Sequence, residues 1–399
     1  MKKNRLLVIS NGFPELSSAR YHCQFVYEQT KLIQDKFDEI TVISPQPYWP
    51  SFLQMIPSLA GYSKLSGFRD YRIGKMRVYY PTYFTLPIRY LREKNYLYMA
   101  RAIEETIRRY HIEYDVAHVH FLYPTAEAAM EIVPGNIPRI LSMHGGDVYV
   151  WVADPKHTQD ARTTWRAYNR LHVPSKYLAD ELIRLDPDLD RNKIFVIPPS
   201  VDSKLFYPKL KKNNSKTVLM VANLVEGKGH LDGLEAFKKV LNVIPEARLK
   251  IIGTGPQYSV IKQRIEEMGL DREVELVGAV AHAKLGKWYR EAAVLMFPSY
   301  TESFGIVQIE AMACGLPVVA YANEGSREVL AEYPQCLVKI GDVGQLSQKL
   351  LQVLSGQIKP ISTQKILAKY SANLISKKLN MLYLPHAEPD QICNKTTKT

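Results

Sequence analysis

Short apolar runs alternate with longer amphipathic segments along most of the chain. The runs are rich in aliphatic and β-branched residues, which predicts buried strands, and the segments between them have helical spacing. Such alternation is typical of parallel sheets with helices on their faces. The first half contains six predicted strands, at 6–10, 40–44, 116–120, 140–143, 171–174 and 194–197. The second half contains five more, at 217–221, 249–252, 274–277, 294–297 and 317–320.

A proline-rich segment separates the two sets of strands. Residues 198–208, PPSVDSKLFYP, precede the polar stretch KLKKNNSK, and this composition indicates an interdomain hinge and loop. We therefore predict two doubly wound, Rossmann-like α/β domains, residues 1–200 and 201–369, which bind ligands where the carboxyl ends of their sheets face a common cleft. A last helix at about 370–385 is a candidate to pack back on the first domain, and residues 386–399 are predicted to be a disordered tail.

Composition supports a folded protein with two domains. The chain has 399 residues, 46% apolar and 23% charged, enough to bury large cores and too many for one ordinary domain. No apolar run approaches the roughly 20 residues that cross a bilayer, so we expect a soluble or peripheral protein. The cysteines lack the spacing of a metal site or a disulfide framework, which favours a reducing, cytoplasmic setting. They are Cys23, Cys314, Cys336 and Cys393.

The positive charge is concentrated in one segment. The chain has a net charge of +12, and residues 61–110 hold eleven Lys or Arg against four Asp or Glu, a net +7, together with nine tyrosines. A segment rich in both basic residues and tyrosine is typical of a surface that binds an anionic membrane, in this case the inner face of the membrane, or a negatively charged acceptor. The alternative is a basic face that contacts only solvent. A nucleic-acid binder is a third class, but no helix-turn-helix, zinc or RNA-recognition motif accompanies the charge, so no nucleic acid is expected.

Two glutamates flank a predicted helix start in TESFGIVQIEAMACGLPVV, residues 301–319. After the preceding strand, a helix should begin near Gly305, which leaves Glu302 in the loop and Glu310 more than one turn inside the helix. The unpaired amides at such a start form an anion site, and carboxylates beside it accept hydrogen bonds from sugar hydroxyls. The alternative is that Glu302 only caps the helix and Glu310 is a solvated helix residue.

Seven segments together resemble the retaining glycosyltransferases of family four, which have the GT-B fold. The segment with the two glutamates resembles the E-x7-E element of that family. The other six occur in the order of the family, and each lies at a predicted strand end: VHFLYP, SMHGGD, VPSKYLADEL, VLMVANLVEGKGH, LKIIGTGP and VELVGAV. The resemblance implies transfer of a sugar from a UDP- or GDP-linked donor to a glycan, a lipid-linked or a small acceptor, as in polysaccharide and cell-envelope synthesis.

The resemblance also assigns roles in the donor domain. Lys228 would neutralise the departing diphosphate, Glu310 would clamp the ribose hydroxyls, and Glu302 would hold the hydroxyls of the donor sugar. The family usually has an arginine where this chain has Asn223, so one fixed cation is replaced. The remaining donor-binding residues are those at the helix start: Ser303, Phe304, Gly305 and Ile306. The reaction would proceed by departure and attack on one face of the sugar, with retention of configuration.

In the amino-terminal domain, His120 would approach the donor sugar as a catalytic residue with Glu302 and Lys228. His144 and Asp147 would lie near the diphosphate or the acceptor hydroxyl. The first loop has only Gly12 where the family has two glycines. Polar side chains could donate there instead: Ser17, Ser18 and Arg20.

No cofactor or metal is expected. The GTG at 253–255 lacks the third glycine of a nicotinamide site, and no DxD-like pair follows a strand, since DPDLD at 186–190 lies in a linker. Lys228 and the helix dipole would replace Mg²⁺. A non-catalytic nucleotide-sugar binder of the same fold remains the second function class, on the grounds of Asn223 and the glycine-poor first loop.

Overall fold

The computed structural model describes residues 3–15, 23–48, 68–85, 94–208, 215–358 and 362–384. The chain folds into two compact units, each of which has most of its residue–residue contacts within itself. Unit 1 comprises residues 1–197 and 376–399, and unit 2 comprises residues 198–375. Several predictions fall outside the described residues: those for Ser17, Ser18 and Arg20, for the polar loop 209–214, for the tail 386–399, and for the parts of the basic segment at 61–67 and 86–93.

Unit 1 is built on an eight-stranded sheet in the order β10-β9-β8-β7-β1-β2-β5-β4, parallel except for the β4–β5 pair. Its strands are β1 (Arg5–Ser10), β2 (Glu39–Ile43), β4 (Tyr71–Ile73), β5 (Met76–Tyr79), β7 (Val116–His120), β8 (Arg139–Ser142), β9 (Arg170–Val173) and β10 (Ile194–Val196). All six strands predicted in this half exist. A separate parallel pair, β3 (Gln46–Tyr48) and β6 (Thr82–Phe84), was not predicted, nor were β4 and β5, because these strands are short and contain few aliphatic residues.

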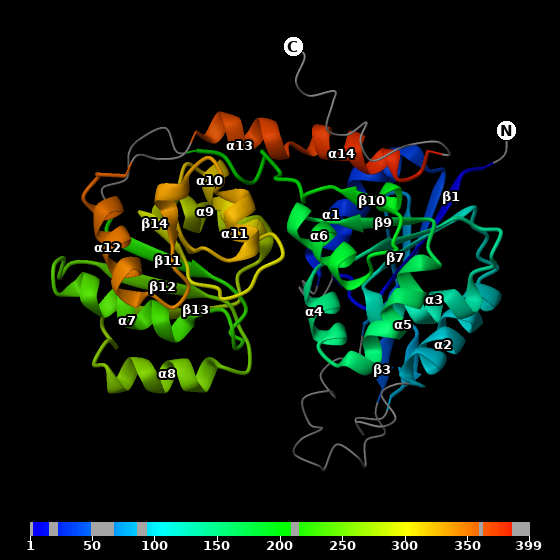
Figure 1. Ribbon diagram of the computed structural model, residues 1–399, viewed down its shortest axis with the longest axis horizontal. Coiled ribbons are helices and arrows are strands. Elements are labelled where there is room, and N and C mark those ends of the chain that lie inside the picture. Colours follow the sequence, from blue (N-terminus) through cyan, green and yellow to red (C-terminus); the bar gives the residue numbers. More distant parts are fainter. Residues whose placement is uncertain are drawn as a thin grey trace. The chain divides into compact units, whose positions relative to one another are not determined.

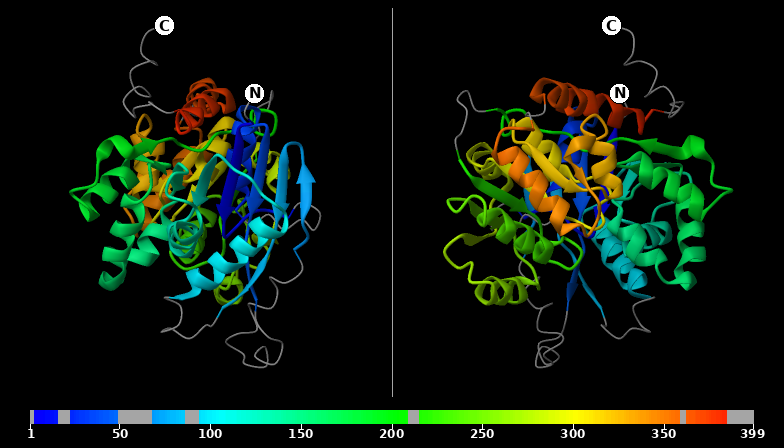
Figure 2. Two further views of the ribbon diagram at one scale, coloured as in Figure 1. Left: turned by 90° about the vertical axis from the view of Figure 1, so that its right-hand side faces the viewer. Right: turned by 60° about the vertical axis from the view of Figure 1, so that its left-hand side comes forward.

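Helices cover both faces of this sheet (Figures 1 and 2). They are α1 (Gln24–Ile33), α2 (Asn95–Arg109), α3 (Glu127–Ile132), α4 (Gly146–Val152), α5 (Pro155–Arg166), α6 (Lys176–Leu185) and the carboxy-terminal α14 (Ala372–Met381), with short turns η2 (Gln34–Lys36), η6 (Leu122–Ala126) and η7 (Arg191–Lys193). Large side chains such as Trp165 and Tyr168 are fully buried between the strands and α5. Burial of this apolar area is the main stabilising term of the unit.

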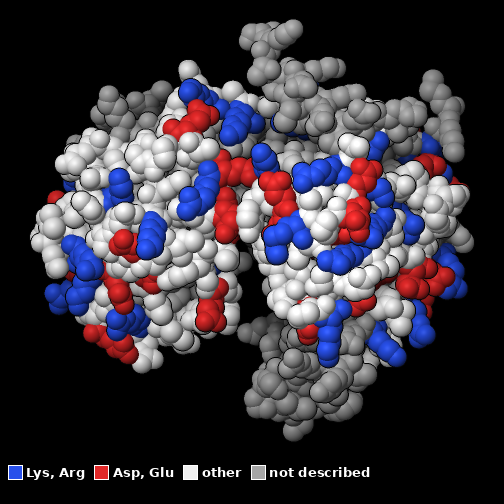
Figure 3. Space-filling view, in the orientation of Figure 1, with Lys and Arg blue, Asp and Glu red and all other residues white. Residues whose placement is uncertain are grey.

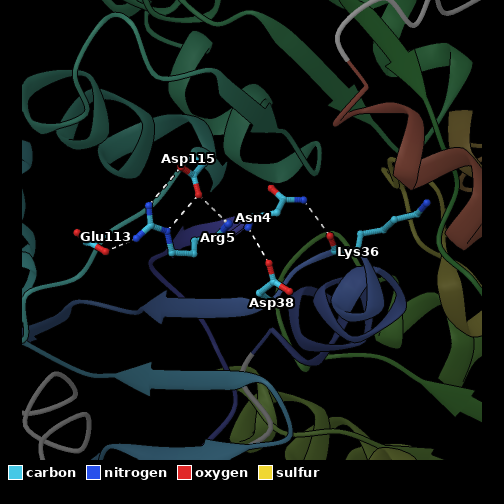
Figure 4. A network of polar contacts seen from close by, with 6 residues as sticks. All are labelled: Asn4, Arg5, Lys36, Asp38, Glu113 and Asp115. Carbon is cyan, nitrogen blue, oxygen red and sulfur yellow. Dashed lines mark hydrogen bonds and ion pairs between the residues drawn. The ribbon is translucent and has the colours of Figure 1, made fainter. Parts of the chain in front are cut away.

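Side chains at the amino end of β1 tie it to its neighbours (Figure 4). Arg5 Nε donates to Asp115 Oδ2 at 3.1 Å, just before β7, and also pairs with Glu113. Asn4 N donates to Asp38 Oδ2 at 2.8 Å, just before β2. These contacts fix the central strands at the edge opposite to their carboxyl ends.

Unit 2 contains a six-stranded parallel sheet in the order β13-β12-β11-β14-β15-β16. Its strands are β11 (Thr217–Val221), β12 (Arg248–Ile252), β13 (Val274–Gly278), β14 (Val294–Phe297), β15 (Val318–Tyr321) and β16 (Leu337–Val338). Its helices are α7 (His230–Leu241), α8 (Tyr258–Glu267), α9 (His282–Glu291), α10 (Ile306–Ala313), α11 (Glu324–Val329), α12 (Val343–Leu354) and α13 (Thr363–Tyr370), with the turn η8 (Pro334–Cys336). In a doubly wound sheet of this order, ligands bind at the carboxyl ends of the strands where the order reverses, here between β11 and β14.

Residues 376–384 pack on the first segment of unit 1. Ser376 Oγ donates to Leu32 O at 2.6 Å, and Arg170 Nη1 donates to Met381 O at 2.7 Å. The ring of Tyr383 packs edge-on against Phe37, with 5.1 Å between the ring centroids. Unit 1 is therefore assembled from two segments of the chain separated by all of unit 2.

The DPDLD segment has a structural role. The Asp186 side chain is buried, and its Oδ2 accepts hydrogen bonds from Trp165 Nε1 at 2.7 Å and Arg166 Nε at 2.8 Å. The Arg166 hydrogen bond, with the Trp165 one, holds the pKa of Asp186 below its ordinary value. This carboxylate therefore fixes α5 to the end of α6.

Candidate functional site

Two loops of unit 2 meet where the strand order reverses. The loop after β11 contains Gly227 and Gly229, and the loop after β14 runs from Pro298 to α10. Tyr300 N donates to Gly227 O at 2.8 Å. Gly229 has a φ of +68°, and a Cβ atom there would lie 1.9 Å from Pro298 O. Only glycine allows the two backbones to approach this closely.

The contact between these loops brings together two residues that the sequence predicted separately. Lys228 Nζ lies 2.7 Å from Glu302 Oε2. Both side chains are partly open to solvent, 25% exposed for Lys228 and 20% for Glu302. A cation and a carboxylate at the carboxyl edge of a parallel sheet can contact a phosphate and a sugar hydroxyl, respectively.

The helix after Glu302 begins as expected. Gly305, with a φ of 88°, precedes α10, and Glu302 O accepts a hydrogen bond from Gly325 N at 2.9 Å. The Phe304 ring is buried against Tyr370, so only the backbone of this residue is available to a ligand. The first amides of α10 lie at the positive end of the helix. A Cβ atom at Gly305 would lie 3.3 Å from Glu302 Cγ, so the helix start is close to the Lys228–Glu302 pair.

Buried polar groups surround the same loops. Gln308 is fully buried under Gly305, and neither atom of its side-chain amide has a hydrogen-bond partner. The hydroxyls of Ser299 and Ser326 are likewise buried without partners. Unpaired buried polar groups are uncommon in folded proteins and are found at functional sites. Sequence reasoning did not single out these three residues.

Glu310 is buried rather than solvated, so the alternative of a solvated helix residue is wrong. The residue is 2% exposed. Its Oε1 lies 2.6 Å from His282 Nε2, and its Oε2 accepts a hydrogen bond from Tyr289 OH at 2.9 Å. Burial and the neighbouring Glu310 carboxylate raise the pKa of Tyr289 well above its ordinary value, so the phenol remains a donor. Neither His282 nor Tyr289 was predicted, although their spacing of seven places them on one face of α9.

The end of β11 also contacts the loop after β12. Leu224 N donates to Thr254 O at 2.9 Å, and a Cβ atom at Gly253 would lie 1.9 Å from Ala222 O. The first glycine of the GTG segment is thus required for close packing of two loops. Asn223, at the carboxyl end of β11, is exposed.

Unit 1 brings its predicted site residues to the carboxyl ends of β7 and β8. His120 Nδ1 lies 3.1 Å from His144 Nε2, and the two rings are parallel. Burial is the main cause that lowers the pKa of both histidines well below the ordinary value, followed by the neighbouring histidines. Both imidazoles are therefore neutral at physiological pH, which suits hydrogen bonding to a sugar hydroxyl and not proton donation.

Asp147 and Gly12 shape the loops of unit 1. Asp147 Oδ1 accepts from His144 N at 2.8 Å, and Oδ2 accepts from Leu122 N at 2.9 Å. The carboxylate thus joins the loops that follow β7 and β8. Gly12 is buried, and its carbonyl accepts from Ser10 Oγ at 2.6 Å. Phe121, between His120 and Leu122, has a φ of +75°, a strained conformation of the kind that clusters at functional sites.

A directed chain of hydrogen bonds crosses the same sheet. His172 Nε2 lies 2.8 Å from Ile197 O, so this nitrogen is the donor. Its Nδ1 must then accept, at 2.7 Å, from Ser142 Oγ, which in turn accepts from His118 Nε2 at 2.7 Å. His118 Nδ1 finally accepts from Tyr383 OH at 2.6 Å. The two hydrogen bonds that Nδ1 of His172 and Nδ1 of His118 accept require neutral imidazoles. The chain connects the carboxy-terminal segment to the last residue of the first segment of unit 1.

We expect unit 1 to lose stability in mild acid because of these histidines. Burial is the main cause that lowers the pKa of His118 to about 3 and that of His172 to about 4. The unfolded chain, with a histidine pKa near 6.5, binds more protons than the folded one below that pH. This stability is therefore complete above about pH 6.5 and is lost as the pH falls through the folded pKa values of about 4 for His172 and about 3 for His118. Hydrogen exchange of the unit 1 amides in denaturant gives the free energy of unfolding at each pH between 7 and 4. The slope of this free energy against pH is the quantity to compare. A double variant, His118→Gln with His172→Gln, should have a shallower slope; an unchanged slope contradicts the assignment.

Charges of both signs cover the face of unit 1 drawn in Figure 3. Within the described part of the basic segment, Arg77 pairs with Glu39 and Arg108 with Glu104. Among the described residues, no helix has the length and apolar content needed to span a bilayer. The same residues contain no cluster of three or more His, Cys, Asp or Glu arranged to hold a metal ion.

Comparisons with known proteins agree with this geometry. Residues 24–205 match the family model "Glycosyltransferase Family 4", and residues 202–373 match "Glycosyl transferases group 1". The chain is 24% identical to the N-acetyl-alpha-D-glucosaminyl L-malate synthase of Bacillus anthracis, over 65% of this chain and 70% of that protein. It is 27% identical to the alpha-monoglucosyldiacylglycerol synthase of Acholeplasma laidlawii, over 53% of this chain and 57% of that protein. Several other curated relatives are matched over only about half to two thirds of their length.

Solved structures share the whole fold. The Anabaena protein HepE, solved in complex with UDP and glucose, superimposes with a TM-score of 0.65 and 15% sequence identity. The superposition covers 95% of this chain and 98% of that one. At this level of identity the likeness establishes the fold and not the ligand.

Proposed function

Because this chain belongs to the glycosyltransferases of family 4, with the GT-B fold, we propose that it transfers a sugar from a nucleotide-diphosphate-sugar to an acceptor with retention of configuration. The observation that carries the proposal is the Lys228–Glu302 pair at 2.7 Å, next to the start of α10. The support is that a cation, a carboxylate and the positive end of a helix lie together at the point where the strand order of unit 2 reverses.

Each part of this site has a role in the proposed reaction. Lys228 and the first amides of α10 stabilise the charge that develops on the diphosphate as it leaves. Glu302 accepts hydrogen bonds from the hydroxyls of the donor sugar and need not be a nucleophile. A leaving phosphate oxygen takes the proton of the acceptor hydroxyl, so attack occurs on the face from which the diphosphate departs. In unit 1, the neutral imidazole of His120 is proposed to form a hydrogen bond with a sugar hydroxyl.

The diphosphate is proposed to be neutralised without a metal ion or other cofactor. Lys228 supplies one fixed charge, and Asn223 supplies a neutral hydrogen bond where the family usually has arginine. Treatment with EDTA should therefore leave transfer activity unchanged, within about twofold. Loss of activity that returns with Mg²⁺ or Mn²⁺ contradicts this part of the proposal.

The donor is proposed to be linked to UDP or GDP, and the acceptor to be a glycan, a lipid-linked sugar or a small molecule. The names of the relatives include both a malate and a diacylglycerol product, and one structural neighbour was solved with UDP. A thermal-shift panel of nucleoside diphosphates and nucleotide-sugars tests the donor, because a ligand at 100 times its Kd stabilises by roughly 2.7 kcal/mol. Incubation of the stabilising nucleotide-sugar with candidate acceptors then distinguishes transfer from the second candidate, a binder without turnover.

We also propose that unit 1 binds an anionic membrane surface through the segment 61–110, as a lipid-linked acceptor would require. The support is the net charge of +7 with nine tyrosines in this segment. Six of its arginines are exposed and lie in the described part of the chain, and two of them, Arg77 and Arg108, pair with glutamates. The other four are Arg69, Arg72, Arg101 and Arg109. Each cation near such a surface contributes about 1 kcal/mol, an effect that salt weakens.

Changing these four arginines to glutamine should release the protein from anionic vesicles in co-sedimentation, whereas neutral vesicles should not retain the parent protein. A matched control changes four exposed lysines of unit 2 to glutamine: Lys239, Lys262, Lys284 and Lys287. Equal release by both variants, or retention that does not depend on lipid charge, contradicts the membrane proposal and leaves the segment as a solvated face.

A further inference from the structure

We infer that His282 is the exposed member of a His282–Glu310 pair that recognises the ribose of the nucleotide, so that the preference for ribose over 2′-deoxyribose depends on the imidazole. The inference rests on the proposed function, because it concerns the nucleotide site of unit 2. It differs from the expectation that Glu310 clamps the ribose by itself.

The position of His282 is the first step. The edge strand β13 ends at Gly278, which has a φ of +81°, and α9 begins at His282. The residue thus lies at the carboxyl edge of the parallel sheet, the edge that also presents Lys228. Ligands of doubly wound sheets bind at this edge.

The hydrogen bonds of Glu310 fix the state of the imidazole. An ionised carboxylate only accepts hydrogen bonds, so His282 Nε2, at 2.6 Å from Oε1, carries a proton. The other carboxylate oxygen is held by Tyr289 OH at 2.9 Å. The ring of Phe206 lies 5.2 Å from the imidazole and 5.9 Å from the ring of Tyr289, which further restricts the ring of His282.

Exposure decides which of the three side chains a nucleotide can reach. The His282 side chain is 23% exposed, whereas Glu310 is 2% and Tyr289 1% exposed. The carboxylate is therefore almost covered by its own donors. A histidine whose N–H is held by a carboxylate has a fixed orientation and a more basic ring, which favours acceptance of a hydrogen bond from a ribose hydroxyl.

The carboxylate retains a share in this recognition. Each oxygen of a carboxylate has two lone pairs, so Oε1 and Oε2 can each accept a second hydrogen bond beside those from His282 and Tyr289. A ribose presents two adjacent hydroxyl donors, which a carboxylate and an imidazole side by side can both accept. A 2′-deoxyribose leaves one of these acceptors without its donor, which costs affinity.

The test compares the Kd values of UDP and 2′-deoxy-UDP by calorimetry, or of GDP and 2′-deoxy-GDP if the parent binds GDP more tightly. For His282→Ala we expect the Kd of the ribonucleotide to rise about tenfold, the typical loss of one strong hydrogen bond, while the Kd of the deoxynucleotide changes less than twofold. The donor KM should rise and kcat should change less than threefold, because the ribose is remote from the bond that breaks.

Tyr289→Phe is the matched control, because it removes the other donor to Glu310 from a position that no ligand reaches. It should lower the melting temperature and keep the ratio of the two Kd values. The inference is overturned if His282→Ala leaves the ratio of the two Kd values unchanged, or if Tyr289→Phe changes this ratio as much as His282→Ala does. It is also overturned if His282→Ala binds the ribonucleotide more tightly than the parent, because the imidazole would then obstruct the site. A parent protein that binds no nucleotide overturns the proposed function itself, whereas a parent that binds normally confines the failure to His282.

Discussion

Lys228→Ala is expected to lower kcat by about 10²- to 10³-fold, because removal of one preorganised group that stabilises transition-state charge typically costs this much. The ammonium lies at the β11–β14 switch point, 2.7 Å from Glu302 Oε2. Steady-state transfer or hydrolysis of the nucleotide-sugar measures the effect. Lys228→Arg, which keeps the charge, should retain more activity than Lys228→Ala.

A control separates loss of charge from loss of structure. Lys239, an exposed lysine of α7, has no place in the site, and Lys239→Ala should have the kcat of the parent. More than a tenth of parental kcat in Lys228→Ala would assign the phosphate role to another group. Asn223→Arg is an informative companion, because a gain in donor affinity would show that the site has one cation fewer than the diphosphate can use.

Glu302→Gln should change turnover and nucleotide affinity in opposite directions. The carboxylate competes with a diphosphate for Lys228 and repels it, so the amide should bind UDP or GDP about two- to fivefold more tightly, the range of a partly exposed ion pair. Turnover should fall on the order of 10²-fold, since the acceptor for the hydroxyls of the donor sugar is lost. Calorimetry with the nucleoside diphosphate and steady-state rates with the nucleotide-sugar measure the two effects.

Glu310→Gln serves as the comparison for this second prediction. It removes a carboxylate that has no contact with Lys228 and should chiefly weaken nucleotide binding. If Glu302→Gln weakens the binding of the nucleoside diphosphate as Glu310→Gln does, the proposal that Glu302 competes with the diphosphate for Lys228 is wrong. If turnover is intact in Glu302→Gln, its role at the donor sugar is wrong.

The association of Lys228 with Glu302 could be anticipated from the sequence, although the two residues are 74 positions apart. Each follows a strand of aliphatic residues, and the strand order of a doubly wound sheet places these two strands side by side. The helix start at Gly305 was also predictable, because a glycine there precedes an apolar segment with helical spacing. Strand order and local pattern together therefore determine this part of the site.

The pairing of Glu310 with His282 could not be anticipated in the same way. It depends on how α9 packs against α10, and the sequence carries no direct information on that tertiary register. The spacing of His282 and Tyr289 shows only that they share a face of a helix. Asp147 is a different case: its carboxylate was assigned to a ligand region, and the structure shows that both of its oxygens accept backbone hydrogen bonds that join two loops. A carboxylate whose oxygens accept backbone hydrogen bonds is less available to a ligand, and a sequence motif does not predict which of these two roles an aspartate has.

The strands β4 and β5 were missed because tyrosine and arginine dominate them. Their inward residues, such as Met76 and Val78, are buried, but they are too few to form an apolar run. The antiparallel pair β4–β5 therefore lies within the segment 61–110, for which the sequence predicted only a basic surface.

The return of the carboxy-terminal segment to unit 1 has a consequence for the synthesis of the protein. Tyr383 and the backbone of Met381 and Leu384 complete the surroundings of His118 and Arg170. A ribosome produces the first segment of unit 1 before unit 2 and these last residues after it. Unit 2 is continuous and can fold as soon as it emerges, whereas unit 1 must wait, with part of its core uncovered, until translation is nearly complete. A stop codon shortly after unit 2 should therefore yield a chain in which the amino-terminal half, although fully translated, is the half recognised by chaperones and proteases.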